Sequence, residues 1–235
     1  MTFELVAQGG LERRERSGVG CIAESGFCPD WIADNYDRYI TPFFEHVYLT
    51  VVSVAIGFAI AFTLALIAHR RQWLVGPITG VTGTLYTVPS VAFFFLLQPI
   101  TGLGNTTAIV ALVCYTLLII FRNVITGLRA VPADAKDAAR GMGLTDRQLL
   151  LRVELPLALP EILAGLRIAT TTTVGLAALA FLAGGGGLGA ELDEQPFFKS
   201  NVAVAGGLAV LLAAALDVII LTFQRLVTPW QRAAA

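Results

Sequence analysis

Five long stretches of the chain carry almost no charge, and this distribution limits the fold more than any other feature. At a rise of about 1.5 Å per residue, roughly 20 apolar residues cross the hydrocarbon layer of a membrane. A buried helix of a soluble protein could explain one such run, but not five in 235 residues. The stretches, of which the last two hold one charged residue each, are 47–68, 74–97, 104–121, 162–190 and 202–224.

The composition agrees with a membrane protein. Apolar residues make up 56% of the chain and charged residues 14%, whereas soluble domains have about 25% charged residues. The formal net charge of −1 leaves no excess of basic residues for binding nucleic acid. We therefore expect an all-α membrane protein with about five transmembrane helices, rather than a soluble enzyme or a disordered chain.

Basic residues predict how the chain is oriented. Because cytoplasmic loops carry an excess of Lys and Arg, we expect the N-terminus outside and the C-terminus in the cytoplasm. Residues 1–45 then form an extracytoplasmic tail without the pattern of a secretory signal peptide, residues 46–230 form the membrane domain, and 231–235 a cytoplasmic tail. The basic residues after the first, third and fifth stretches are Arg70, Arg71, Arg129, Lys136, Arg140, Arg147, Arg152, Arg225 and Arg232.

Two polar features within the apolar stretches are candidates for the translocation pathway. Pro89, followed by Ser90, predicts a break in the second stretch, because proline removes a backbone hydrogen bond that lipid cannot replace. An ordinary kink is the alternative. Asp217 is an acid deep in the last stretch, where ionisable residues are costly; it could contact cargo or form a structural hydrogen bond. Arg167 lies nearer a helix end and can snorkel.

The long connection over residues 130–156 reads as two short helices. Pro132 can begin the first and Gly143 can end it. Thr145 with Gln148 resembles a capping box that opens the second, and Pro156 limits its continuation. Two short helices held between two membrane spans form a rigid unit, the lever, that a cytoplasmic partner could bind. An amphipathic loop lying on the membrane is the alternative.

Other motifs are rejected or left open. Residues 184–189 match Gly-x-Gly-x-x-Gly but follow no strand, so we expect a flexible outer loop instead of a dinucleotide site. His46 and His69 lie roughly 34 Å apart along a helix, and we expect no metal site. No phosphate-binding loop of the Walker type occurs. Cys21 and Cys28 could form a disulfide outside the cell or remain free thiols.

One motif in the long connection is similar to that of a known family. The pattern Asp137-Ala-Ala-x3-Gly143-x9-Val153-x-Leu155-Pro156 resembles the Glu-Ala-Ala loop of the permease subunits of binding-protein-dependent ATP-binding-cassette (ABC) importers. Asp137 stands for the usual Glu and Val153 for the usual Ile. The sequences of residues 138–160 and 185–189 resemble the glycine betaine/carnitine/choline osmoprotectant branch, and the similarity covers about residues 47–227.

This resemblance implies a type I ABC importer permease fold with cytoplasmic coupling helices and no catalysis by this chain. It implies that the loop docks into a groove on an ATPase, and that a glycine-rich segment lies near the external gate. The implied coupling residues are Asp137, Ala138, Ala139, Gly141, Gly143, Val153, Leu155 and Pro156, and the implied gate residues are Gly185, Gly186, Gly187 and Gly189.

The resemblance also implies partners and cargo. The chain would pair with a second permease, identical or a sibling, with ATPase subunits that bind ATP and Mg, and with an extracytoplasmic binding protein, in the lipid of a bacterial inner membrane. A quaternary ammonium cargo could bind aromatic faces such as Tyr86 by cation–π attraction. A permease for another small solute, such as methionine, is an alternative. A stand-alone secondary carrier would normally show paired repeats and coupling charges.

Overall fold

The computed structural model describes residues 26–230, and all regular structure within them is helical. Three segments are long and apolar enough to cross a membrane. They are α3 (Ile40–Arg70), which the 3-10 helix η1 (Tyr36–Tyr39) precedes directly, α6 (Asn105–Ala130) and α11 (Lys199–Val227). Helical structure already runs through η1 into α3, ahead of residue 46, and the boundary of the outer tail at residue 45 stays a prediction.

The second apolar stretch is a pair of helices bent by 100°. Helix α4 (Val75–Thr87) ends before Val88, and α5 (Ser90–Thr101) follows Pro89. Val88 is extended, with ψ of 128°, because the proline ring disfavours helical geometry in the residue before it. Tyr115 of α6 donates its hydroxyl hydrogen to the Val88 carbonyl at 2.5 Å. The predicted break is therefore confirmed, and a neighbouring helix satisfies the backbone there.

The fourth apolar stretch is not a single helix. Helix α9 (Leu155–Ala177) begins before it, and the 3-10 helix η4 (Ala180–Ala183), a glycine loop and α10 (Leu188–Glu194) follow. Within the described residues, α9 is not among the candidate spans; it contains the charged Glu161 and Arg167, and residues 170–173 are all threonines. Their hydroxyls donate to carbonyls one turn earlier. That α9 crosses the membrane as one of five spans therefore stays a prediction.

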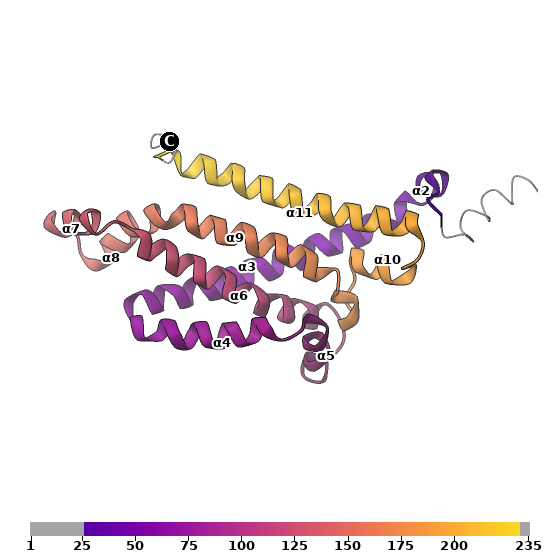
Figure 1. Ribbon diagram of the computed structural model, residues 1–235, viewed down its shortest axis with the longest axis horizontal. Helices are drawn as coiled ribbons and strands as arrows, with labels where there is room; N and C mark the ends of the chain where they lie inside the picture. Colours follow the sequence, from indigo (N-terminus) through magenta and orange to yellow (C-terminus); the bar gives the residue numbers. More distant parts are fainter. Residues whose placement is uncertain (1–25, 231–235) are drawn as a thin grey trace, which may run out of the picture.

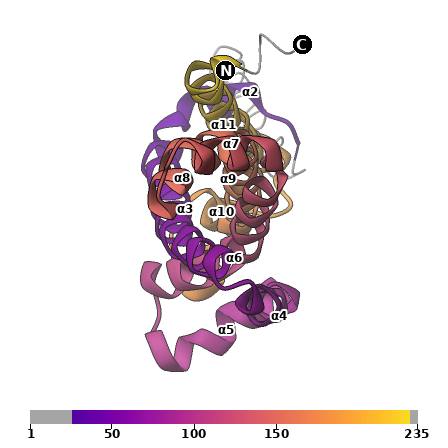
Figure 2. The ribbon, with the colours of Figure 1, turned by 90° about the vertical axis from the view of Figure 1, so that its left-hand side faces the viewer.

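Helices α3, α6 and α9 pack into the centre of the bundle through small residues. A β-carbon built on Gly57 of α3 would lie 1.8 Å from Oγ1 of Thr116, and one on Gly165 of α9 would lie 2.4 Å from Cβ of Asn123. Glycine at these positions lets the backbones of membrane helices approach closely. Helix α11 lies outside α9, and α4 and α5 lie on the opposite side of the bundle (Figure 1, Figure 2).

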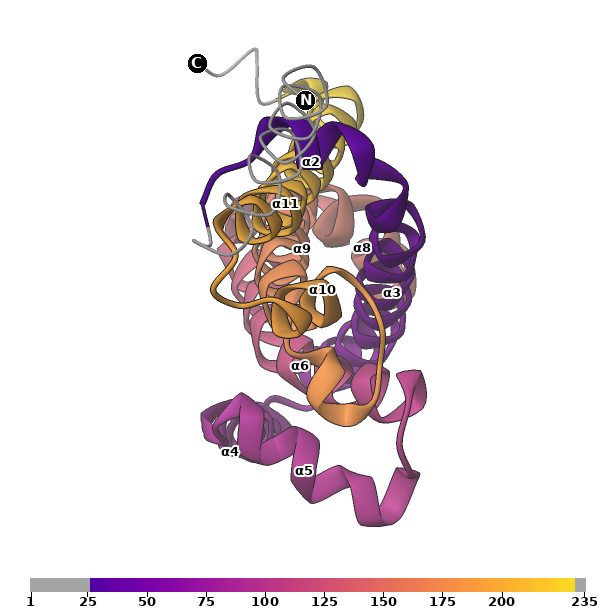
Figure 3. The same cartoon turned by 90° about the vertical axis from the view of Figure 1, so that its right-hand side faces the viewer.

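The short helices gather at the two ends of the bundle. Helix α2 (Pro29–Asp34) and α10 lie at one end, with α10 across the end of the bundle (Figure 3). Helices α7 (Ala133–Gly141) and α8 (Asp146–Leu149) lie together at the other end (Figure 1). A π-helical turn, η3 (Leu150–Glu154), joins α8 directly to α9, and the 3-10 helix η2 (Gln72–Leu74) joins α3 to α4.

Candidate functional site

The predicted lever exists as α7 and α8, and its first helix has the predicted ends. Pro132 is the N-cap of α7, and Gly143 has a φ of +83°, in the left-handed region that favours glycine. The amide of Leu144 donates to the Ala139 carbonyl at 3.2 Å, which ties the turn back to the helix. The chain therefore reverses sharply between α7 and α8.

Helix α8 begins with the predicted capping box. The Thr145 amide donates to Oε1 of Gln148 at 2.9 Å, and the Gln148 amide donates to Oγ1 of Thr145 at 3.4 Å. These reciprocal bonds satisfy amides that the first helical turn leaves without partners. The start of α8 is thus fixed by local interactions alone.

Four of the eight predicted coupling residues are exposed at this end of the molecule. Asp137, Ala138, Gly141 and Gly143 are exposed, whereas Ala139 is only 1% exposed and anchors α7 to the bundle. Met142 lies between two of the exposed glycines with 74% of its surface exposed. The α7–α8 turn therefore presents a small apolar surface that a protein partner can contact. The remainder of the motif is partly buried and lies at the junction of η3 and α9: Val153, Leu155 and Pro156.

The prediction that Pro156 limits the continuation of the second helix is wrong. Helical structure runs without interruption from α8 through η3 into α9, and Pro156 lies in the first turn of α9. A π-helical turn directly before it accounts for this continuity, because the wider turn relieves the usual clash between the proline ring and the carbonyl four residues earlier. The lever and α9 are consequently one continuous element.

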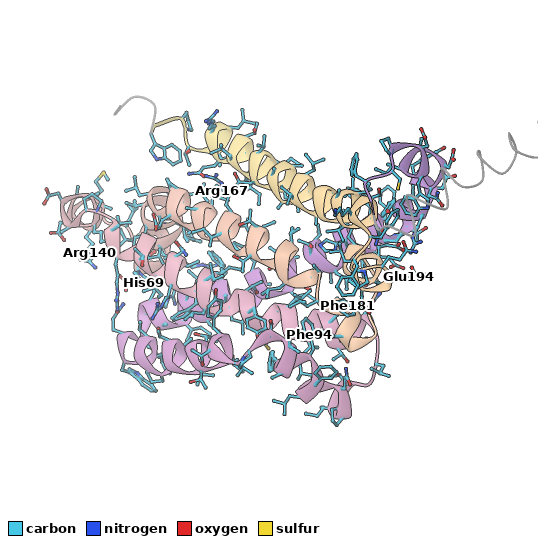
Figure 4. All side chains as sticks on the ribbon, turned by 45° about the vertical axis from the view of Figure 1, so that its right-hand side comes forward. His69, Phe94, Arg140, Arg167, Phe181 and Glu194 are labelled. Carbon is cyan, nitrogen blue, oxygen red and sulfur yellow. The ribbon has the colours of Figure 1, made fainter. Side chains whose placement is uncertain are left out.

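A buried carboxylate at this junction was missed by the sequence analysis. Glu154 is 6% exposed; His69 of α3 donates from Nε2 to its Oε2 at 3.0 Å, and Nζ of Lys136 on α7 lies 3.2 Å from its Oε1. Beside this cluster is a polar cavity of about 400 Å³ that Arg70 and Arg140 also line. His69 and Arg140 are labelled at the same end of the bundle in Figure 4. Only the fold brings these residues together.

The glycine-rich segment at the opposite end is packed tightly, which differs from the flexible loop expected from the sequence. The amide of Gly187 donates to Oε2 of Glu45 at 3.0 Å, and that of Gly186 donates to Oδ1 of Asn105 at 3.3 Å. A β-carbon on Gly189 would lie 1.8 Å from the Ala178 carbonyl oxygen. At Gly185 the space is tight but less so, since a β-carbon would lie 3.0 Å from the Ala180 carbonyl oxygen.

An ion cluster fixes α10 next to this loop. Arg38 of η1 forms ion pairs with Glu191 and Glu194 of α10. The hydroxyl of Tyr39 donates to Oδ1 of Asn201 at 2.7 Å. The segment before α3 thus holds α10 and the start of α11 in place.

The predicted pathway residues do not meet within one chain. Tyr86, Pro89 and Ser90 lie at the break between α4 and α5, where the ring of Tyr86 contacts that of Tyr115 edge to face at 6.0 Å. Asp217 lies on α11, on the other side of the bundle (Figure 2). These residues are two separate features of the chain.

Asp217 has a partner that the sequence analysis did not assign. Arg167 of α9 donates from Nε to Oδ1 and from Nη2 to Oδ2 of Asp217, both at 2.8 Å. Arg167 lies between α9 and α11 in Figure 4. The bidentate pair satisfies both charges, which supports the structural alternative for Asp217.

The proposed disulfide involves residues at the edge of the described structure. Cys21 lies outside the described residues, so the Cys21–Cys28 pairing remains a prediction. Cys114 is a free, partly buried cysteine of α6.

Known proteins resemble this chain in sequence along most of its length. Residues 51–233 match the family model described as "Binding-protein-dependent transport system inner membrane component". The choline transport system permease protein OpuBB of Bacillus subtilis is 34% identical over 79% of this chain and 87% of its own length. The osmoprotectant import permease protein OsmW of Salmonella typhimurium is 34% identical over 85% of this chain and 96% of its own length.

A solved structure has the same fold. An inward-facing conformation of the MetNI methionine ABC transporter matches with a TM-score of 0.74 and 24% identity, over 80% of this chain and 95% of the matched chain. This likeness confirms the predicted all-α fold of an ABC importer permease. With the family model covering more than half of the residues, the comparisons show that this chain belongs to the binding-protein-dependent transport system inner-membrane component family.

Proposed function

We propose that this chain is the permease subunit of an ABC importer for a small osmoprotectant, a quaternary ammonium compound such as glycine betaine, choline or carnitine. The observation that carries the proposal is the exposed α7–α8 turn with the coupling motif, in a chain 34% identical to a choline permease and to an osmoprotectant import permease. The subunit itself catalyses no reaction. It provides the path that a partner ATPase opens and closes.

The ATPase is proposed to bind the α7–α8 turn. Asp137, Ala138 and Gly143 are exposed there, and Met142 adds an apolar side chain to the contact surface. ATP and Mg would be held by the ATPase, since this sequence has no Walker motif. Closure of two ATPase subunits would displace α7 and α8 and shift the bundle between outward-facing and inward-facing states by differential contacts.

A second permease subunit, identical or a sibling, is proposed to pack against the α4–α5 side. Gly76, Gly80 and Gly83 share one face of α4, and a β-carbon built on each meets nothing within 4 Å in this chain. Small residues at such spacing are typical of faces where membrane helices approach closely. The binding protein would dock at the opposite end from the ATPase, above α10 and the glycine loop.

The membrane orientation follows from these partners. The α7–α8 end carries the ATPase surface and belongs in the cytoplasm, while α10 belongs outside the bacterial inner membrane. The basic residues predict the same orientation, with the N-terminus outside and the C-terminus inside.

The cargo class is supported by the relatives and by aromatic rings at the helix break. The ring of Tyr115 has two aromatic neighbours, both edge to face. Its centroid lies 6.0 Å from that of Tyr86 and 5.6 Å from that of Phe93. Tyr86 keeps 38% of its surface exposed, so its ring is available to a quaternary ammonium group by cation–π attraction. A methionine cargo has no comparable support, because the MetNI likeness at 24% identity concerns the fold.

The test is uptake of radiolabelled glycine betaine, choline and methionine by cells that lack this gene and carry it on a plasmid. We expect uptake of a quaternary ammonium compound that stops when the Walker lysine of the partner ATPase is replaced. Gly143→Asp should abolish uptake without loss of the protein from the membrane, because a β-carbon disfavours the left-handed backbone at this position and the carboxylate adds charge to the contact surface.

Two outcomes would contradict the proposal. Uptake that follows a proton or sodium gradient without the ATPase would identify a secondary carrier. Uptake of methionine, without uptake of any quaternary ammonium compound, would show that the chain belongs to an importer with a different cargo.

A further inference from the structure

Glu154 connects three elements at the α7–α8 end through polar contacts. Its two carboxylate oxygens have different partners: Lys136 on α7, at 3.2 Å from Oε1, and His69 near the end of α3, at 3.0 Å from Oε2. Glu154 itself belongs to η3, directly before α9. One side chain therefore links the coupling helix, the start of α9 and the end of α3.

The link bridges a gap in the packing. The cavity of about 400 Å³ lies between the end of α3 and the α7–α8 region. His69 and Arg70 line it on the α3 side, and Arg140 and Leu149 line it on the other side. Since this space is open, a displacement of α7 is not passed to α3 by close packing across it. The ion cluster at its wall supplies a direct connection.

Burial makes this connection stiff. Glu154 is 6% exposed, and the side chains of Lys136 and His69 are 20% and 16% exposed. Removal of one partner from a buried ion pair leaves an uncompensated charge and is strongly unfavourable. The π-helical turn places Glu154 in this position, and such turns recur at functional sites. The three groups therefore form one connected, largely buried cluster.

We propose that Glu154 is a positioning residue that transmits the displacement of α7 to α3. This inference rests on the proposed function, because it takes the ATPase as the source of the displacement. Without the carboxylate, α7 would still respond to the ATPase, but α3 would follow it incompletely. ATP hydrolysis would then continue with little import.

The test uses the whole importer in proteoliposomes: this permease, its second permease subunit, the ATPase and the binding protein, with radiolabelled glycine betaine as cargo. In Glu154→Gln we expect the number of molecules imported per ATP hydrolysed to fall about tenfold, within the usual range of coupling between sites. Glu161→Gln is the matched control, since Glu161 lies two turns further along the same helical run and is half-buried. Glu154→Asp keeps the charge and should recover part of the ratio.

A purely structural role predicts a different result. If Glu154 only helped the protein fold, import and hydrolysis would fall in proportion and their ratio would match that of the Glu161→Gln control; this outcome overturns the proposal. Absence of ATP-dependent import by the wild-type importer would instead reject the proposed function.

Hydrogen exchange gives a readout that does not need activity. In the purified complex, amides of α7 should exchange about tenfold faster in Glu154→Gln than in the Glu161→Gln control, because α7 loses its tie to η3 and α3. Exchange of α7 that is equal in the two variants would overturn the proposal, whatever the transport assay gives.

Discussion

At the scale of single residues, charges within a membrane protein depend on partners from other helices. Arg167 and Asp217 lie 50 positions apart and form a bidentate pair. In hydrocarbon, either charge alone would be costly. The pair therefore fixes α11 to α9 at one point, and Gln224 of α11 adds a second polar contact by donating to the Pro160 carbonyl at 3.4 Å.

Replacing one member of this pair should destabilise the protein more than replacing both. Asp217→Leu leaves the Arg167 guanidinium without its carboxylate, so the melting temperature of the purified protein should fall by several degrees. Arg167→Met combined with Asp217→Leu should recover most of that loss, because buried pairs are often replaced by apolar residues without cost. The measurement is thermal unfolding in detergent. Equal melting temperatures for the single variant and the wild type would contradict a stabilising role for the pair.

Gly189 illustrates a steric limit at the same scale. Gly189→Ala places a methyl group 1.8 Å from a backbone oxygen, which no side-chain movement can relieve, and we expect a loss of about 1–3 kcal/mol as for other overpacked sites. Gly207→Ala on α11 is the control, since nothing lies within 4 Å of its added carbon. Thermal unfolding of both variants compares them, and equal melting points would rule out the close contact.

At the scale of elements, the coupling lever is built from local signals that the sequence displays. The proline before α7, the left-handed Gly143 and the Thr145 capping box all lie where the residue pattern predicts them. Its continuation into α9 was not predicted, because the π-helical turn that accommodates Pro156 has no sequence pattern as distinct as a cap.

The capping box can be tested directly. Thr145→Ala removes the hydroxyl that accepts from the Gln148 amide and should cost about 1 kcal/mol. Thr145→Ser keeps that hydroxyl and should behave as the wild type. Hydrogen exchange of the amides in α8 measures the effect. These amides should exchange faster in Thr145→Ala than in the wild type, and at the wild-type rate in Thr145→Ser. Equal protection in the two variants would mean that η3 and α9, rather than the cap, hold α8.

At the scale of the whole molecule, the two ends of the bundle differ in chemistry. The end with α7 and α8 bears an exposed turn and a cluster of basic residues, whereas the end with α10 bears Glu191, Asp193 and Glu194. This asymmetry matches an importer that meets an ATPase on one side of the membrane and a binding protein on the other.

Cysteine labelling tests the orientation of the molecule. In a variant whose three native cysteines are serine, Asp134→Cys on α7 should react with a membrane-impermeant maleimide only after the cells are opened. Asp193→Cys on α10 should react in intact cells. The reverse pattern would invert the proposed topology and remove the ATPase from the α7–α8 turn.

The helical membrane fold, the break at Pro89, the α7–α8 lever and the family can all be predicted from the residues in order, because each depends on local composition or on spacing along the chain. Which charges meet depends on how the helices pack. Glu154 joins His69 across 85 positions, and Glu45 holds the amide of Gly187 across 142. Hydropathy and motif spacing do not predict such contacts, because the packing of the helices creates them. For the same reason the glycine segment could be read as flexible, whereas neighbouring helices fix it.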